Sequence, residues 1–270
     1  MNHVTRYAAR AGAVAAAVIL IGSSTWATER GLGRAGGYGT PFAGNRIVYG
    51  ERQAFNGATA FTWARTNVFG QVQEVGVSIP RSLIWNPRHG HGPLGAFVSL
   101  EFPDVVKDST FFNHFEGHWE PSGHPPNAFA TPHFDLHFYG IPESDVWNIV
   151  PPDTRVPDAN QVPPGYVYPG VNDAVPQMGV HATNPADLTR PFTAAMVFGY
   201  WGGNMTFIEP MVTREYLMRR PNFALSVPRP QYLYRATQYP SVFRSHFNQR
   251  SQSYEFTFTG FSGISAPPVG

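Results

Sequence analysis

The chain has 270 residues, a length compatible with one large β domain or two smaller ones, and 14% of its residues are charged, against about 25% in an ordinary soluble protein. Aromatic residues also reach 14%, and the 27 glycines and 26 prolines favour short strands joined by many turns. The formal net charge of +1, with no basic run longer than Arg219-Arg220, argues against nucleic-acid binding, and the lack of cysteine excludes disulfides, thiolate nucleophiles and thiolate metal sites.

The N-terminus has the three parts of a secretory signal. Arg6 and Arg10 give a positive region, residues 11–21 form an apolar run, and residues 25–27 read Thr-Trp-Ala, a small-residue cleavage site. A run of 11 residues is too short to span a bilayer, which needs about 20. We therefore expect a signal peptide at 1–27, export to the periplasm or beyond, and no stable membrane insertion after its removal; the alternative is an uncleaved anchor.

The next residues, 28–54, are rich in glycine and arginine and have no sustained period, which predicts a flexible arm. A single β domain is expected from 55 to 263, with a tail at 264–270. Alternating apolar residues predict its strands, two of them between 58 and 79 and others at 94–102, 133–139, 192–201, 204–208, 231–237 and 252–261.

Two further segments break this pattern. Residues 150–175 are dense in proline, which predicts an extended loop, either a lid over a site or a surface loop. Residues 210–220 predict a short helix, because Pro210 suits a first helical turn and Pro221 ends the periodic pattern. The fold class predicted is all-β, a barrel or sandwich of about nine or ten strands with one short helix.

The candidate functional residues cluster at 115–139, a segment that contains four of the ten histidines. If 133–139 is a strand, His133, Asp135 and His137 share one face, and the two histidines stand about 13 Å apart. Only neighbours along the strand could then share an ion. A helix would bring both histidines to one side, but Pro132 and the aromatic residues favour the strand.

Other ligands must come from elsewhere in the chain. His124 lies on a Gly- and Pro-containing loop, and His181 and Glu209 follow later in the chain. The sequence predicts that four histidines hold a divalent transition metal (Zn, Fe, Mn or Cu) and that Asp135 or Glu209 handles protons; these histidines are His124, His133, His137 and His181. A small-molecule ligand could occupy such a centre. The alternative is an oligomeric structural or small-ligand-binding protein in which the polar cluster braces strands, so catalysis stays open.

Two resemblances follow from these motifs. The segment from Pro176 to His181 is similar to the second motif of cupins, which bind metal through His and Glu, but it has one extra residue. More of the chain, about 56–261, resembles a family of exported bacterial proteins of unknown function, typified by a stress-regulated protein of a thermophilic bacterium. The resemblance rests on the runs WEPSGHPPNAFATPHFDLHFY, PQMGVH and FGYWGGNMTFIEPMVT, and this chain departs from it at Ser122 and Pro125. It implies a β-rich, homo-oligomeric fold and brings no reaction.

Overall fold

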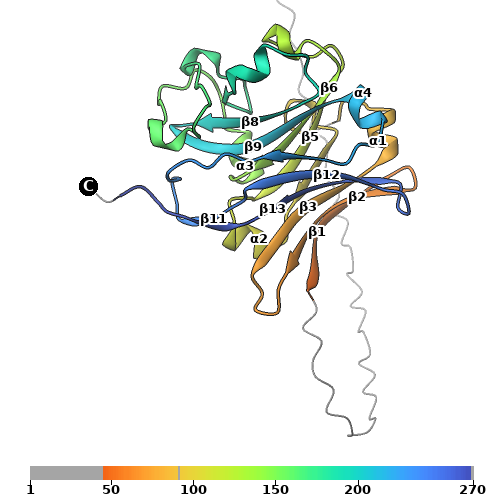
Figure 1. Ribbon diagram of the computed structural model, residues 1–270. Helices are drawn as coiled ribbons and strands as arrows, with labels where there is room; N and C mark the ends of the chain where they lie inside the picture. Colours follow the sequence, from red (N-terminus) through yellow and green to blue (C-terminus); the bar gives the residue numbers. More distant parts are fainter. Residues whose placement is uncertain (1–44, 91, 269–270) are drawn as a thin grey trace, which may run out of the picture. The chain divides into compact units, whose positions relative to one another are not determined.

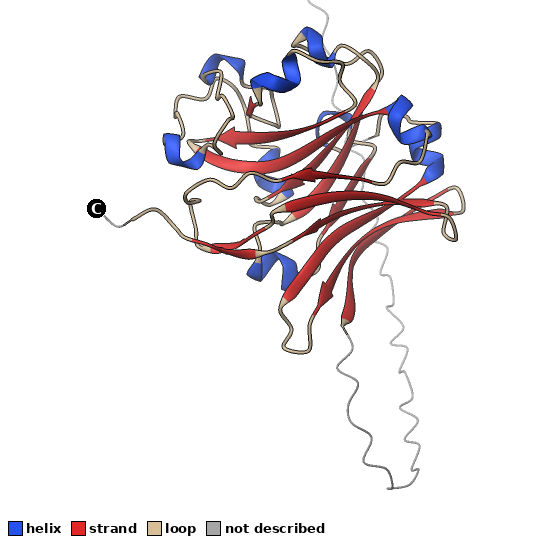
Figure 2. Cartoon of the chain, in the orientation of Figure 1, coloured by secondary structure: helices blue, strands red, loops and turns tan. Residues whose placement is uncertain are grey.

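Two six-stranded antiparallel sheets dominate the computed structural model, which describes residues 45–90 and 92–268 (Figures 1 and 2). Sheet A has the order β1 (Arg46–Phe55), β2 (Ala58–Thr66), β3 (Val72–Pro80), β13 (Ser253–Thr259), β12 (Val242–Asn248) and β10 (Phe223–Ser226). Sheet B has the order β4 (Val98–Glu101), β5 (His114–Glu120), β6 (His133–Tyr139), β9 (Asn204–Thr213), β8 (Ala194–Trp201) and β7 (Val180–Ala182). A separate pair joins β11 (Thr237–Tyr239) to β14 (Ser262–Ile264).

Helices in the described residues are few and short. The α-helices are α1 (Arg81–Trp85), α2 (Asp104–Ser109), α3 (Glu143–Val146) and α4 (Arg214–Met218). The 3-10 helices are η1 (Pro93–Gly95), η2 (Asn127–Phe129), η3 (Ala159–Gln161), η4 (Val171–Asp173) and η5 (Pro185–Leu188). None of the helices described is long and apolar enough to cross a membrane.

Phenylalanine packing holds the two sheets together. The ring of Phe258 on β13 lies 4.8 Å from that of Phe112 and 4.7 Å from that of Phe138 on β6, measured between ring centroids. Phe138 also packs edge-on against Phe243 of β12. These aromatic side chains fill the space between the sheets, so the fold is a sandwich-like pair of open sheets and not a closed barrel.

The all-β prediction is confirmed. The predicted numbers of strands and helices were too low, because the described residues contain 14 strands and four α-helices. The predicted hairpin at 192–208 is also present, because Gly202 and Gly203 both take the positive φ that a two-residue turn between β8 and β9 requires (64° and 79°).

The predicted helix at 210–220 was wrong in its first half. Strand β9 continues through Pro210, which pairs with Met196, and α4 begins only at Arg214. The apolar residues around Pro210 alternate between the faces of a buried strand, so burial in the sheet outweighs the helix-start signal. Proline has no amide hydrogen to donate, and the pairing of β6 with β9 skips Leu136 and His137 opposite this point.

Part of the predicted arm is also ordered. Residues 46–54 belong to β1, because Asn56 and Gly57 form a two-residue turn with positive φ that pairs β1 with β2. The predicted signal peptide and residues 28–44 of the arm lie outside the described residues, as do the last two residues of the tail.

The proline-dense segment packs against the edge of sheet B that is formed by β7 and β8. Tyr166 lies 4.8 Å from Phe198 of β8, ring to ring, and Asp153 accepts a hydrogen bond from the amide of Gly202 (2.7 Å). These anchors place it beside β7 and β8. Its use as a lid stays a prediction.

Candidate metal centres

One face of sheet B is polar although it is buried. All seven residues of β6 are buried, and its alternation confirms the predicted strand, with His133, Asp135 and His137 on the face that points away from sheet A. On β5, His118 stands directly opposite Asp135 and Glu116 opposite His137. Since a strand presents every second side chain to the same face, two neighbouring strands build a two-dimensional array of imidazoles and carboxylates.

Loops cover much of this polar face and shield it from solvent. Phe129 of η2 packs with Val197 and Met211, and Val146 of α3 packs with Tyr139. In Figure 1, loops and short helices lie above β8 and β9, on the side of these strands away from β12 and β13. Polar groups placed in such surroundings need a partner, since burying them unpaired costs about 1–3 kcal/mol each.

The first candidate centre, called group 1, consists of His124, His133 and Asp135. The Nε2 atoms of the two histidines are 3.1 Å apart, and they lie 3.4 Å (His124) and 3.0 Å (His133) from carboxylate oxygens of Asp135. Three atoms bound to one ion at 2.0–2.2 Å in tetrahedral geometry would be separated by about 3.4 Å. The spacing therefore fits a single metal ion.

The tautomers of group 1 are fixed by the backbone. Nδ1 of His124 lies 2.8 Å from the carbonyl oxygen of Pro125, and Nδ1 of His133 lies 2.6 Å from that of Thr131. A carbonyl oxygen only accepts, so both Nδ1 atoms carry the hydrogen. If both rings are neutral, the Nε2 atoms of His124 and His133 carry lone pairs, and these point toward each other and toward the carboxylate of Asp135. This arrangement is repulsive unless a cation, either a proton or a metal ion, lies between them.

The pKa shifts of group 1 show how a proton can act as the cation between these groups. Burial alone would lower the pKa of His124, but the hydrogen bond and charge of Asp135 outweigh it and raise this pKa to about 9. Burial would likewise raise the pKa of Asp135, yet its interactions with the imidazoles of His124 and His133 hold it far below its ordinary range. Oδ1 of Asp135, although 3.0 Å from His133, lacks hydrogen-bond geometry. A proton satisfies group 1 only in part.

The second candidate centre, group 2, consists of His137, His181 and Glu209. Oε1 of Glu209 lies 3.5 Å from Nε2 of His137, and Oε2 lies 3.7 Å from Nε2 of His181. These distances are too long for good hydrogen bonds. Both ring nitrogens of His137 and Oε2 of Glu209 are buried and have no hydrogen-bond partner among the described residues.

Burial shifts every member of group 2 toward its neutral form. It lowers the pKa of His137 well below the ordinary value and that of His181 to about 4. Burial, with the nearby charge of Asp135, raises the pKa of Glu209 well above its ordinary range. No charge within group 2 compensates another, which is the situation that a bound cation would reverse.

A third cluster on β5 offers a contrast. Glu116 accepts from Nε2 of His114 (3.2 Å) through one oxygen and from Nε2 of His118 (3.3 Å) through the other, while Nδ1 of His114 faces the carbonyl oxygen of Ile141. Burial would raise the pKa of Glu116, but these two hydrogen bonds outweigh it and lower the pKa. Both carboxylate oxygens of Glu116 and both ring nitrogens of His114 have a partner, and Nδ1 of His118 has none among the described residues. The cluster forms an ion-paired brace along β5 in which both oxygens of the carboxylate have a partner.

The structure divides the four predicted histidines between two groups instead of bringing them to one ion. His124 and His133 belong to group 1, and His137 and His181 to group 2, since positions 133 and 137 are separated by two strand periods. Asp135 and Glu209 occupy ligand positions, and their predicted role as proton carriers stays a prediction.

The brace on β5 was missed as a unit. Its signal is present in the sequence, because His114, Glu116 and His118 alternate in the same way as His133, Asp135 and His137. What the sequence lacks is the register that sets β5 against β6.

Comparison with known proteins adds no further assignment. No family model matches the chain, and neither a curated protein nor a solved structure is significantly similar to it. The two buried triads that could hold metal ions are therefore the observation on which function must be argued.

Proposed function

We propose that this protein binds two divalent transition-metal ions, one in each triad of two imidazoles and one carboxylate. The observation that carries the proposal is the set of unpartnered buried atoms of group 2, namely both ring nitrogens of His137 and Oε2 of Glu209. Folded proteins rarely leave such atoms unpaired. The brace on β5 supports the distinction, because both of its histidines bond to the carboxylate of Glu116, whereas neither ring nitrogen of His137 has a partner among the described residues.

The ligand set narrows the class of ion. Imidazole nitrogens with one carboxylate suit Zn, Fe, Mn or Cu and are poor ligands for Ca²⁺ and Mg²⁺. Three protein ligands leave at least one coordination position for water or a small ligand. His124 and His181 provide the access, since 34% and 22% of their side-chain surface reaches solvent.

The proposal includes export and homo-oligomeric assembly. Export is supported by the positive region, apolar run and cleavage-like residues of the N-terminus, and assembly by the family resemblance alone. In an exported protein, a cysteine-free site of nitrogen and oxygen ligands would withstand oxidising surroundings.

Metal analysis of the purified protein tests the proposal. We expect about two equivalents per chain in the wild type and about one in His133→Ala and in His137→Ala, measured by mass spectrometry after exhaustive dialysis. His246→Ala is the matched control, because His246 lies on β12 of the other sheet and bonds only to Asn222. Protein that folds normally but holds no metal would favour the alternative, a polar cluster that only braces strands.

A further inference from the structure

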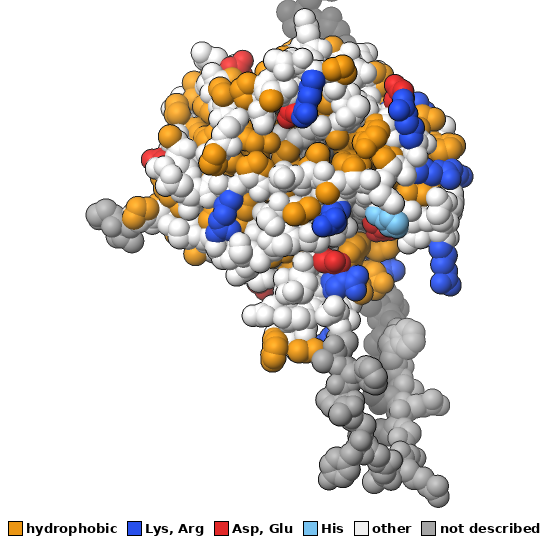
Figure 3. Space-filling view, viewed as in Figure 1, with side chains coloured by type: hydrophobic (Ala, Val, Ile, Leu, Met, Phe, Trp, Pro, Cys, Tyr) orange, Lys and Arg blue, Asp and Glu red, His pale blue; other side chains and the backbone are white. Residues whose placement is uncertain are grey.

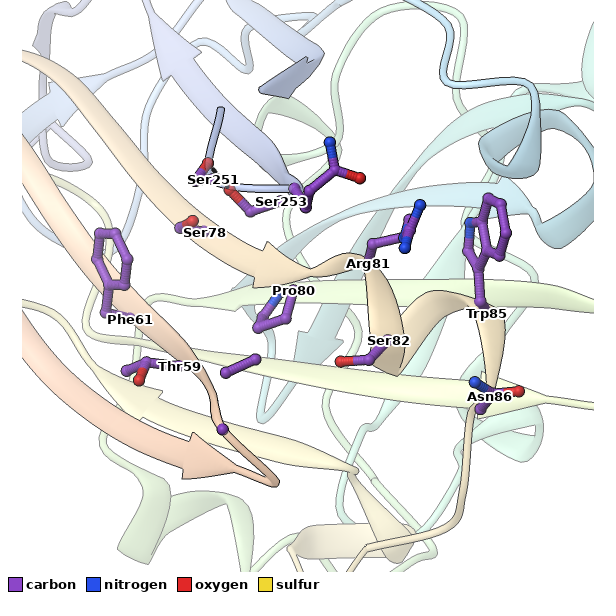
Figure 4. A pocket seen from close by; sticks show the side chains of 13 residues that line it. Thr59, Phe61, Ser78, Pro80, Arg81, Ser82, Trp85, Asn86, Ser251 and Ser253 are labelled. Carbon is purple, nitrogen blue, oxygen red and sulfur yellow. Dashed lines mark hydrogen bonds between the residues drawn. The ribbon is translucent and has the colours of Figure 1, made fainter. Parts of the chain in front are cut away.

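A second feature of the molecule lies away from the histidines, at one end of sheet A. The turn between β1 and β2, the start of α1 and the turn between β12 and β13 enclose a hollow of about 480 Å³ (Figure 4). That volume lies within the 300–1,000 Å³ of small-molecule sites. No residue of groups 1 and 2 lines it.

Several polar side chains of the hollow have hydrogen-bonding capacity to spare. The guanidinium of Arg81, the hydroxyl of Ser82 and the amide of Asn86 form no side-chain hydrogen bond within the described part of the chain. Ser82 and Asn86 are exposed and lie one helical turn apart, so both reach the same space. The hollow thus presents donors and acceptors together.

Charged groups of both signs lie around the site; besides Arg81, the guanidinium of Arg220 lies over Trp85 and that of Arg52 over Phe61, both at 5.4 Å. The carboxylate of Glu255 accepts hydrogen bonds from Ser78 and Ser253, both 2.8 Å, and those two serines line the hollow. On the other side the guanidinium of Arg81 stacks over Trp85 at 4.7 Å, which holds it in place without a carboxylate partner among the described residues. An anionic ligand would meet the charge of Glu255, and a cationic one that of Arg81. A neutral polar ligand meets neither penalty.

One wall of the hollow is aromatic. Phe61 stands at the end opposite Arg81 and Trp85, as Figure 4 shows. Its ring lies 5.7 Å from that of Tyr49, which is 52% exposed and extends the apolar surface along β1. Charged side chains are sparse on the face of the molecule in Figure 3. An aromatic wall beside free hydroxyl, amide and guanidinium groups matches a ligand whose rings have an apolar face and a rim of hydroxyls.

We propose that this hollow is a binding site for a neutral carbohydrate, with Phe61 packing against a sugar ring and with Arg81, Ser82 and Asn86 bonding its hydroxyls. The inference is independent of the metal centres, because it uses the other sheet and other residues.

Ligand-observed NMR titration with three neutral disaccharides, maltose, cellobiose and diacetylchitobiose, tests this site. We expect saturable binding of at least one of them by the wild type, about tenfold weaker binding by Asn86→Ala, and none by Ser82→Leu, whose side chain would occupy the space. Ser144→Leu on exposed α3 is the matched control and should bind as the wild type does. Circular dichroism would verify that each variant folds.

Three results would overturn the assignment. The first is no saturable binding of any of the three sugars up to about 10 mM. The second is tighter binding of inorganic phosphate or glucuronate than of every neutral sugar, which would make the hollow an anion site. The third is binding that both Ser82→Leu and Asn86→Ala leave unchanged.

Discussion

Glu209 shows at the scale of a single residue what the protein gains from a cation. Its carboxyl is 1% exposed, its Oε2 has no partner, and burial raises its pKa well above the ordinary value. Because the folded-state pKa is raised, its contribution to stability is greatest below about pH 4.5 and falls as pH rises toward the folded-state value. At neutral pH the buried carboxyl of Glu209 therefore lowers the stability of the metal-free protein.

The variant Glu209→Gln should separate stability from metal binding. In the presence of a chelator at pH 7 we expect it to be at least as stable as the wild type, since an amide of similar size replaces an uncompensated acid. At a free Zn²⁺ concentration 100 times the dissociation constant, each occupied site should raise the free energy of unfolding by about 2.7 kcal/mol. The wild type should gain this amount from two sites and the variant from only one. Urea denaturation with and without Zn²⁺ measures both. Loss of several kcal/mol in the chelated variant would mean that Glu209 acts as a structural group.

His124 supplies the pH dependence of group 1. Its pKa is raised to about 9, so the stability that its proton contributes is fully present below about pH 6.5 and is lost as pH rises through 9. The melting temperature of chelated protein should therefore fall between pH 6.5 and 9, and Zn²⁺ should remove that fall by replacing the proton.

Thermal melts across this pH range provide the check. His124→Gln in chelator should lose most of the decline, because position 124 then has no imidazole to titrate beside Asp135. A decline of the same size in this variant would assign the effect to another group.

At the scale of the element, strand β6 was predicted but not its register, and β5 was not predicted as a strand. The alternation of His133, Asp135 and His137 with apolar residues fixes the faces of β6, and the sequence predicts this strand correctly. The partner of each residue depends on loops and on sheet order, which local patterns do not contain. For this reason the division of four histidines into two groups could not be predicted from the sequence.

The brace on β5 gives a prediction of its own. Glu116→Gln removes one charge of a fully buried ion pair and should destabilise the protein by about 3–5 kcal/mol. The variant should nevertheless keep about two equivalents of metal where it is folded, since Glu116 belongs to neither group. Chemical denaturation and metal analysis on the same sample measure the two effects. Loss of metal without loss of stability would make Glu116 a ligand.

For the molecule as a whole, composition predicted an all-β fold, and the described residues bear it out. The error at 210–220 has a general cause: a proline after a carboxylate looks like a helix start, but burial between β6 and β8 decides for strand. The number of strands was underestimated in part because short strands such as β7 and β11, of three residues each, have too little pattern to detect, and in part because β5 and β12, of seven residues each, were not predicted.

The packing between the sheets should control stability without touching the metal centres. Phe138 is fully buried and lies between the two sheets against Phe243 and Phe258. Phe138→Ala should cost about 3–5 kcal/mol in the free energy of unfolding. Denaturant titration measures it, and a loss below about 1 kcal/mol would contradict the proposed core.

The most direct measurement of the central claim is the anomalous scattering of a zinc-loaded crystal. We predict two separate peaks per chain, one bonded to His124, His133 and Asp135 and the other to His137, His181 and Glu209. A single peak shared by the four histidines, or no peak at either triad in zinc-saturated crystals, would contradict the account.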